Sequence, residues 1–225
     1  MCGRFAFYSA HEAMPALFGL DDPIAVEASY NIAPTENAAV IRLNERDRPF
    51  GSMLRWGLIP FWSKDPAIGN RLINARSETA REKPAFRAAY KQRRCLVPAD
   101  GFYEWRAEAT GKQPFYISAR TGEPFSLAGL WESWRARDSD NVVETFTILT
   151  RTPNDYVGRL HKRMPVVLDP EAGRDWLAGT LAQSGSSDEF PATPDDYLVA
   201  WPVERTVNNP RNNGPDLIRA IGAEL

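Results

Sequence analysis

The sequence predicts an α+β fold that is mainly β, with mixed sheets curled into an incomplete barrel and a few short flanking helices. Short stretches rich in aromatic and β-branched residues recur along the 225 residues, and 15 glycines and 18 prolines punctuate them. Helix patterns are few and short. Many short strands with few helices are typical of sheets that curl towards a barrel.

We expect one domain over residues 1–225, because a chain of this length buries a sizeable core without disulfides or metals. Cys2 and Cys95 are too few for a disulfide framework. With two histidines and no CxxC spacing, we expect no metal site and no cofactor. The sequence has neither a membrane-length apolar run nor a signal-peptide pattern, so we expect a cytoplasmic protein without membrane contact.

The N-terminal part is predicted to contain one helix and two strands. Ser9-Ala10-His11-Glu12 has the form of a capping box, which predicts a helix from Ser9 to Phe18 with His11 in its first turn. Tyr30–Thr35, which contains a proline, is predicted to be a loop. The expected strands are Ala38–Leu43 and Gly51–Trp56, and the aromatic segment Trp56–Trp62 follows as a loop.

Strands dominate the rest of the chain. Ile73–Glu78 is predicted to be extended, and Pro84–Tyr90 to form a short helix. Asp169-Pro170-Glu171 is an N-cap followed by a proline and an early acid, which predicts a helix to about Ala178. The other predicted features are strands at Arg94–Val97, Phe102–Trp105, Pro114–Ile117, Phe125–Trp131, Thr145–Thr150, Met164–Leu168 and Leu198–Val203, hairpin tips at Gly111-Lys112 and Asp138–Asn141, a polar loop at Ala182–Thr193 and a closing helix near Asp216–Ala220.

The charge is unevenly spread although its net value is only −2. Eight basic residues lie between Arg71 and Arg94 against two acids, whereas the segment from Asp169 to Asp196 is acidic. The net charge argues against indiscriminate coating of nucleic acid, but the basic segment is compatible with a local phosphate-binding face. The alternative is a solvated helix face around Pro84–Gln92.

The N-terminus carries the most specific chemical feature. Removal of Met1, which a small second residue permits, would leave Cys2 with a free α-amine beside its thiol. An α-amine titrates near ~7.7–8.0 and a thiol near ~8.5, so both groups are partly nucleophilic at neutral pH. A 1,2-aminothiol condenses with an aldehyde to a Schiff base, and its sulfur then closes a thiazolidine ring. The alternative is a small buried hydrophobic residue.

Four further side chains suit proton transfer or polar binding. Asn74 and Arg76 lie two residues apart in an extended segment and share one face, where an amide could hold a hydroxyl and a guanidinium a phosphate. Glu104 is flanked by aromatic residues, whose burial would raise the pKa of its carboxyl and make it a proton donor. Histidine suits proton transfer near neutral pH, and no helix start explains His161. Each residue could instead be purely structural.

Two other segments could contact a nucleic acid. Exposed aromatic side chains beside basic residues stack on unpaired bases, whereas buried ones belong to the core. The aromatic candidates are Trp56, Phe61 and Trp62. In the asparagine-rich tail, the candidates for the sugar-phosphate backbone are Asn208, Asn209 and Arg211, with an ordered turn as the alternative.

Seven motifs in order, nearly end to end, resemble one known family. They are MCGRF at the start, YNIAP at Tyr30–Pro34, WGLIPFW at Trp56–Trp62, INARSET at Ile73–Thr79, RRCLVPADGFYEW at Arg93–Trp105, LHKRMPVVL at Leu160–Leu168 and VNNPRNNGPDLI at Val207–Ile218. The family that they resemble is the SOS-response-associated peptidase (SRAP) family.

This resemblance implies a sensor of abasic sites in single-stranded DNA. Cys2 would attack the aldehyde of the ring-opened deoxyribose and end as a thiazolidine DNA–protein crosslink that shields the lesion. Asn74 would orient the sugar, Glu104 would act as acid and base, and His161 would assist proton transfer. The residues expected to contact DNA are Arg4, Arg76, Trp56, Phe61, Trp62, Asn208, Asn209 and Arg211.

The resemblance also carries expectations about processing and assembly. The family name implies a peptidase that removes its own leading residues, but Met1 directly precedes Cys2, so an aminopeptidase acting in trans would suffice. We do not expect general proteolysis. We expect a monomer that is associated with the nucleoid when it is bound to DNA.

Two other functions stay open on the sequence. An N-terminal-nucleophile amidohydrolase of the glutamine amidotransferase kind also begins Met-Cys-Gly and would use Cys2 against a carboxamide. It predicts a layered sheet sandwich. A non-covalent single-strand-binding module would use the aromatics and arginines and would form no adduct.

Overall fold

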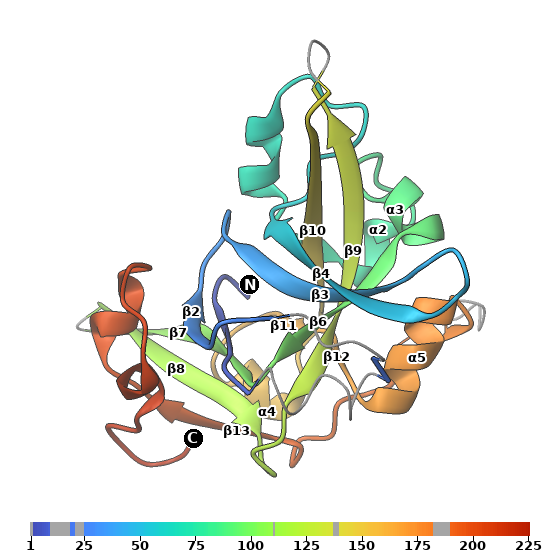
Figure 1. Ribbon diagram of the computed structural model, residues 1–225. Helices are drawn as coiled ribbons and strands as arrows, with labels where there is room; N and C mark the ends of the chain where they lie inside the picture. Colours follow the sequence, from blue (N-terminus) through green and yellow to red (C-terminus); the bar gives the residue numbers. More distant parts are fainter. Residues whose placement is uncertain (1, 10–18, 21–24, 110, 137–139, 182–189) are drawn as a thin grey trace.

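The computed structural model describes residues 2–9, 19–20, 25–109, 111–136, 140–181 and 190–225, and it contains two sheets (Figure 1). One has five strands in the order β13-β8-β7-β1-β2, and every neighbouring pair in it is antiparallel. Its strands are β1 (Phe5–Phe7), β2 (Ser29–Ile32), β7 (Gly101–Glu108), β8 (Gly111–Ala119) and β13 (Leu198–Pro202).

The second sheet closes on itself. β10 pairs in parallel with β4 and antiparallel with β9, so the strands β4-β3-β6-β9-β10 form a closed ring. This confirms a mainly β fold with curled mixed sheets, and the ring of five strands is complete. The strands are β3 (Asn37–Leu43), β4 (Pro49–Trp56), β6 (Arg94–Ala99), β9 (Phe125–Arg135) and β10 (Val142–Arg151), with β5 (Asn74–Arg76), β11 (Met164–Pro165) and β12 (Val167–Leu168) added at the side.

The helices are short. α5 (Pro170–Ala178) lies where the sequence predicts it, since the Asp169 side chain accepts the Ala172 N–H at 2.9 Å and Gly179 ends the helix with φ of 80°. It packs on β6, β9, β12 and β3. The other helices in the described part of the chain are α2 (Ser77–Ala80), α3 (Arg87–Gln92), α4 (Asp155–Gly158) and the 3₁₀ helices η1 (Pro66–Arg71), η3 (Arg205–Asn208) and η4 (Pro215–Ile218).

Several predicted boundaries are wrong. Tyr30–Thr35 is not wholly a loop, because β2 runs over Ser29–Ile32 and pairs with β1, a strand that the sequence did not indicate. Ile73–Glu78 is extended only over Asn74–Arg76 and then turns into α2, and the helix predicted at Pro84–Tyr90 begins later, as α3. The predicted closing helix is η4.

Other predicted features lie on residues that the structure does not describe. These are nearly all of the helix Ser9–Phe18, including His11, most of the loop Ala182–Thr193 and part of the hairpin tip Asp138–Asn141.

The buried apolar side chains of the described residues form two hydrophobic clusters. The larger one includes Cys2, Phe5, Trp56 and Phe146, and the smaller one gathers around Tyr103 in the five-stranded sheet. Cys2 therefore lies inside the protein rather than on its surface. No helix among the described residues is long and apolar enough to cross a membrane.

Candidate active site around Cys2

Strand pairing brings Cys2 to Glu104. β1 runs antiparallel to β7 with Phe5 opposite Phe102, and the Tyr103 N–H donates to the Arg4 carbonyl at 2.9 Å. Continued by two residues, this register places Gly3 opposite Glu104. The Cys2 side chain, just before Gly3, is fully buried. The pairing of β1 with β7 is thus what brings Cys2 close to Glu104.

Asn74 holds the backbone of Cys2. It is the first residue of β5, which is fixed in parallel pairing with β10, and its Nδ2 donates to the Cys2 carbonyl at 2.7 Å. Its Oδ1 is buried and has no hydrogen-bond partner among the described residues. A buried amide oxygen without a partner is costly, so this oxygen is suited to accept a hydrogen bond from a bound group.

Glu104 and His161 form an acid–base pair beside Cys2. Glu104 is 2% exposed, and its Oε1 lies 3.8 Å from His161 Nδ1. Burial raises the pKa of the Glu104 carboxyl, and the nearby His161 opposes part of that effect. Burial, and then the charge of Glu104, raise the pKa of the Cys2 thiol. The structure therefore brings together all four predicted reactive or orienting residues, Cys2, Asn74, Glu104 and His161.

The segment after α4 fixes the imidazole of His161. The Arg163 N–H donates to His161 Nδ1 at 3.1 Å, and the Arg163 carbonyl lies 3.1 Å from the same nitrogen. When Nδ1 carries no proton it accepts from the Arg163 N–H, and when it is protonated it can donate to the Arg163 carbonyl. The Arg163 guanidinium is held in turn by Glu78, at 2.5 and 2.8 Å, and by the Thr150 carbonyl at 2.5 Å.

A cavity of about 530 Å³ opens onto this pair and is lined by Glu104, Trp105, Lys112, His161 and Asn208. Trp105 Nε1 donates to Asn208 Oδ1 at 2.8 Å. The sequence did not indicate Lys112, because the hairpin tip was predicted at Gly111-Lys112. Glu108 faces Gly111 and Ala107 faces Lys112, so Lys112 already belongs to β8.

The aromatic segment is divided between core and surface. Trp56 is 0% exposed, stacks on Phe146 with ring centroids 6.2 Å apart, and donates from Nε1 to the Ile73 carbonyl at 2.8 Å. Its predicted stacking on bases is therefore wrong: as the last residue of β4 it points into the closed ring. The side chains of Phe61 and Trp62 are 57% and 50% exposed, so burial does not prevent them from stacking on bases.

The predicted phosphate contacts fall into two groups. Arg76 and Arg211 are exposed, as is the side chain of Asn208 at the cavity. Arg4 is partly buried, and its Nη1 donates to Asn31 Oδ1 at 2.6 Å and to the Val207 carbonyl at 2.9 Å, so its present partners are protein oxygens. Asn209 Oδ1 accepts the Arg211 N–H at 3.1 Å. This hydrogen bond belongs to an ordered turn, which is the alternative interpretation of the asparagine-rich tail. The contacts of these residues with DNA stay predictions.

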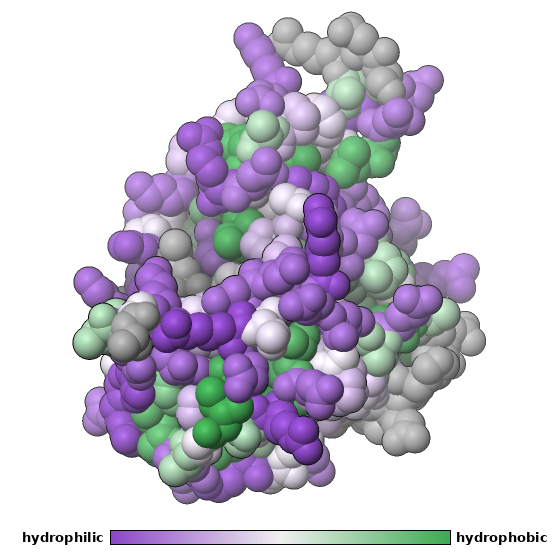
Figure 2. Space-filling view, turned by 90° about the vertical axis from the view of Figure 1, so that its left-hand side faces the viewer, coloured by the Kyte–Doolittle hydropathy of each residue, from purple (hydrophilic) through white to green (hydrophobic). Residues whose placement is uncertain are grey.

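Much of the described surface is hydrophilic (Figure 2). Six of the eight basic residues between Arg71 and Arg94 are exposed. The face turned to the viewer in Figure 2 is mostly hydrophilic, with small separate hydrophobic areas. Within the described part of the chain, no group of three or more His, Cys, Asp or Glu side chains could hold a metal ion.

Comparisons with known proteins agree along nearly the whole chain. The family model described as "SOS response associated peptidase (SRAP)" matches residues 1–210. The chain is 39% identical to the abasic site processing protein YoqW of Bacillus subtilis, over 98% of this chain and 100% of that one. It is 33% identical to the abasic site processing protein YedK of Escherichia coli, over 98% and 100% of the two chains.

Solved structures show the same fold. A crystal structure of a protein from Bacteroides thetaiotaomicron superposes with a TM-score of 0.83 at 25% identity, over 97% of this chain and 99% of that one. A protein from Bordetella bronchiseptica superposes with a TM-score of 0.75 at 27% identity, over 90% and 100% of the two chains.

Proposed function

Because this chain belongs to the SOS response associated peptidase (SRAP) family, we propose that it processes abasic sites in single-stranded DNA and captures them covalently through Cys2. The relatives carry abasic site processing in their names. The observation that carries the covalent part is the position of Cys2, buried against Asn74 and close enough to Glu104 for that carboxylate to raise the pKa of its thiol.

The proposed reaction requires the free amine that removal of Met1 exposes. The amine nitrogen of Cys2 adds to the aldehyde carbon of the ring-opened deoxyribose, and loss of one water gives an imine. The thiol sulfur then adds to the imine carbon, and the thiol proton ends on the nitrogen. The product is a thiazolidine, and the net reaction releases one water.

The neighbouring residues serve the proton transfers of this sequence. A buried carboxyl with a raised pKa is a competent acid near neutral pH, so Glu104 protonates the departing hydroxyl. His161, with Nδ1 3.8 Å from that carboxyl, returns or removes the proton. Asn74 fixes the Cys2 carbonyl and offers its unpartnered Oδ1 to a sugar hydroxyl. Phe61 and Trp62 contact bases beside the lesion, and Arg76 contacts a phosphate.

We assign the peptidase in the family name to removal of the leading residue alone. A glutamine amidotransferase-like reading is not supported, because it predicts a layered sandwich and the second sheet instead closes as a ring. A cytoplasmic monomer remains our expectation.

The test uses the purified protein, shown by mass spectrometry to lack Met1, and a single-stranded oligonucleotide with one abasic site. We expect a boiling-resistant shifted band on a denaturing gel, absent with an undamaged strand. Cys2→Ala should abolish the band, whereas Cys95→Ala, which removes the other buried thiol, should retain it.

Two results would contradict the proposal. If the processed protein gives no band, covalent capture is wrong, and retention of undamaged and abasic strands alike would then indicate a non-covalent binding module. If Cys2→Ala keeps the full band, another nucleophile forms the adduct.

A further inference from the structure

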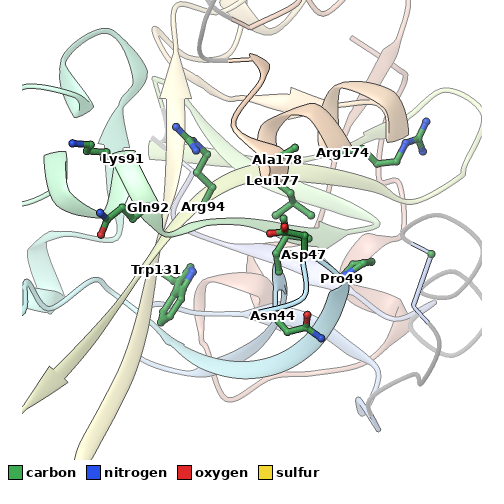
Figure 3. A pocket seen from close by; sticks show the side chains of 12 residues that line it. Asn44, Asp47, Pro49, Lys91, Gln92, Arg94, Trp131, Arg174, Leu177 and Ala178 are labelled. Atoms are coloured by element: carbon green, nitrogen blue, oxygen red, sulfur yellow. The ribbon is translucent and has the colours of Figure 1, made fainter.

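A second pocket lies where α3, α5 and the turn between β3 and β4 meet (Figure 3). Its volume is about 820 Å³, and it shares no lining residue with the cavity at Glu104. Pockets of this size hold small organic ligands in many proteins. Nothing in the proposed reaction at Cys2 uses it.

The charged lining of this pocket is mainly cationic, with Lys91 and Arg174 on opposite sides of it in Figure 3. Lys91 of α3, Arg94 of β6 and Arg174 of α5 line it, against Asp47 as its one acidic lining residue in the described part of the chain. Lys91 and Arg174 are exposed, so their charges are available to a ligand. A surplus of positive charge in a concave site favours an anion.

Arg94 is the built element of the pocket. Its guanidinium carbon lies 5.3 Å from the ring centroid of Trp176 and 5.7 Å from that of Tyr90. Its Nε is buried without a hydrogen-bond partner, and no ion pair joins Arg94 to a carboxylate of the described residues. Burial lowers the pKa of Arg94, Tyr90 opposes part of that effect, and the charge of Arg81 adds to it. Arg81 is a second positive charge near Arg94, so it does not neutralise the Arg94 guanidinium.

The end of α5 is shaped around this guanidinium. Gly179 has φ of +80°, and a Cβ there would lie 2.5 Å from Arg94 Nη1. The partial negative charge at the C-terminal end of a helix stabilises a cation, which gives Arg94 a structural role. That role does not account for Lys91 and Arg174, which line the same pocket.

The other lining groups are aromatic, apolar and amide. Trp131 has the Arg42 guanidinium 4.3 Å from its ring centroid, and Arg42 is paired with Glu144 at 2.7 and 2.6 Å. Arg42 therefore fixes the indole and is not available to an anion. Asn44 and Gln92 add amide groups to the lining. A flat ring with polar edges would find partners here.

We propose that this pocket binds a nucleoside phosphate, with the phosphate at Lys91 and Arg94 and the base against Trp131. Inorganic phosphate would leave the indole and the amides unused, and a nucleoside alone would leave the cations unused. A nucleoside phosphate is present both in a free nucleotide and at the 5′-phosphorylated end of a DNA strand.

The test is isothermal titration of the full chain at low salt with deoxyadenosine monophosphate, deoxyadenosine and inorganic phosphate. We expect saturable binding of the monophosphate, about tenfold tighter than of either fragment. Lys91→Gln should weaken it about three- to tenfold, since it removes a charge-assisted contact, and Arg174→Gln should weaken it less, since Arg174 acts only through its positive charge in the lining. Arg219→Gln, which removes an exposed cation elsewhere, is the matched control.

Strands with a 5′-phosphate or a 5′-hydroxyl distinguish the sources. Tighter binding of the 5′-phosphorylated strand than of the 5′-hydroxyl strand assigns the pocket to DNA ends, and saturable binding of the monophosphate with equal binding of the two strands assigns it to a free nucleotide. Equal affinities for the monophosphate and the nucleoside would overturn the proposal, because the pocket would then not recognise the phosphate. No saturable binding of the monophosphate, or unchanged binding by Lys91→Gln and Arg174→Gln, would overturn it as well.

This result is independent of the proposed capture of abasic sites. Arg174→Gln lies outside the Cys2 site and the basic segment, so crosslinking should be unchanged in it. Failure of nucleotide binding with intact crosslinking would reject only the second pocket.

Discussion

At the scale of single residues, the carboxyl of Glu104 is buried in the site, and burial disfavours its charged form. In the unfolded chain the Glu104 carboxyl ionises near ~4.3, and in the folded chain burial raises its pKa. Between the pKa of the unfolded state and that of the folded state, the folded protein therefore binds more protons. The contribution of the protonated Glu104 to stability is present at acid pH and is lost as the pH rises through the folded-state pKa. Acid–base function and stability are opposed at this residue.

Glu104→Gln is expected to raise the stability of the protein and to lower its activity. The amide has the same shape and no charge, so the variant should melt at a higher temperature than the parent protein at pH 7.5, and the difference should shrink towards pH 4. Crosslinking should slow about a hundredfold, because general acid catalysis is lost. Thermal unfolding at several pH values checks the first part. A less stable variant at pH 7.5 would mean that the attraction to His161 outweighs burial.

Asn74 acts through position rather than charge. Asn74→Ala removes the hydrogen bond to the Cys2 carbonyl and the acceptor offered to the sugar. We expect crosslinking about 10- to 100-fold slower under single-turnover conditions, with little change in DNA affinity. Gel time courses and an affinity measurement check this. Asn37→Ala, at an exposed asparagine, is the control. A weakened affinity with a normal rate would instead make Asn74 a binding residue.

At the scale of elements, the aromatic loop after β4 depends on one glycine. Gly57 has φ of +124°, and a Cβ there would lie 2.6 Å from the Gly69 carbonyl in η1. Gly57→Ala should lower the free energy of unfolding by at least about 2 kcal/mol, because backbone strain and a clash with backbone add up. Gly122→Ala has φ of +77° and open space, and should cost only about 1 kcal/mol. Denaturant unfolding compares them, and equal losses would contradict the clash.

The elements that the sequence predicts well are those with local signals. α5 was predicted because its cap, proline and terminal glycine are adjacent in the chain. β1 and β2 were missed because their strands are short and their stability comes from pairing with distant segments. Trp56 was misassigned for a related reason: the sequence marks an aromatic loop, but only ring closure between β4 and β10 decides which tryptophan is buried.

At the scale of the whole molecule, the site depends on contacts between distant parts of the chain. Cys2, Asn74, Glu104 and His161 could be selected individually by their chemistry. Their proximity, and the cavity formed with Lys112 and Asn208, could not be derived from local patterns, because it results from the pairing of β1 with β7 and of β5 with β10.

Asn31 joins the two ends of this assembly. It is 2% exposed, its Oδ1 accepts from Arg4, and its Nδ2 donates to the carbonyls of Val207, Asn209 and Asn212 at 3.4, 3.1 and 2.8 Å. One amide thus orders the segment after Cys2 and the asparagine-rich tail together. Removing it would leave several buried polar groups without partners.

Asn31→Ala is therefore expected to lower the free energy of unfolding by about 3 kcal/mol or more, since each unsatisfied buried group costs about 1–3 kcal/mol. Hydrogen exchange should accelerate in β1 and over residues 205–214 together, and crosslinking should slow although Asn31 does not line the cavity. Asn70→Ala, which removes an exposed asparagine bonded to Arg55, is the control. Faster exchange in the tail alone would show that the two ends are held independently, and the coupling between the tail and Cys2 would be wrong.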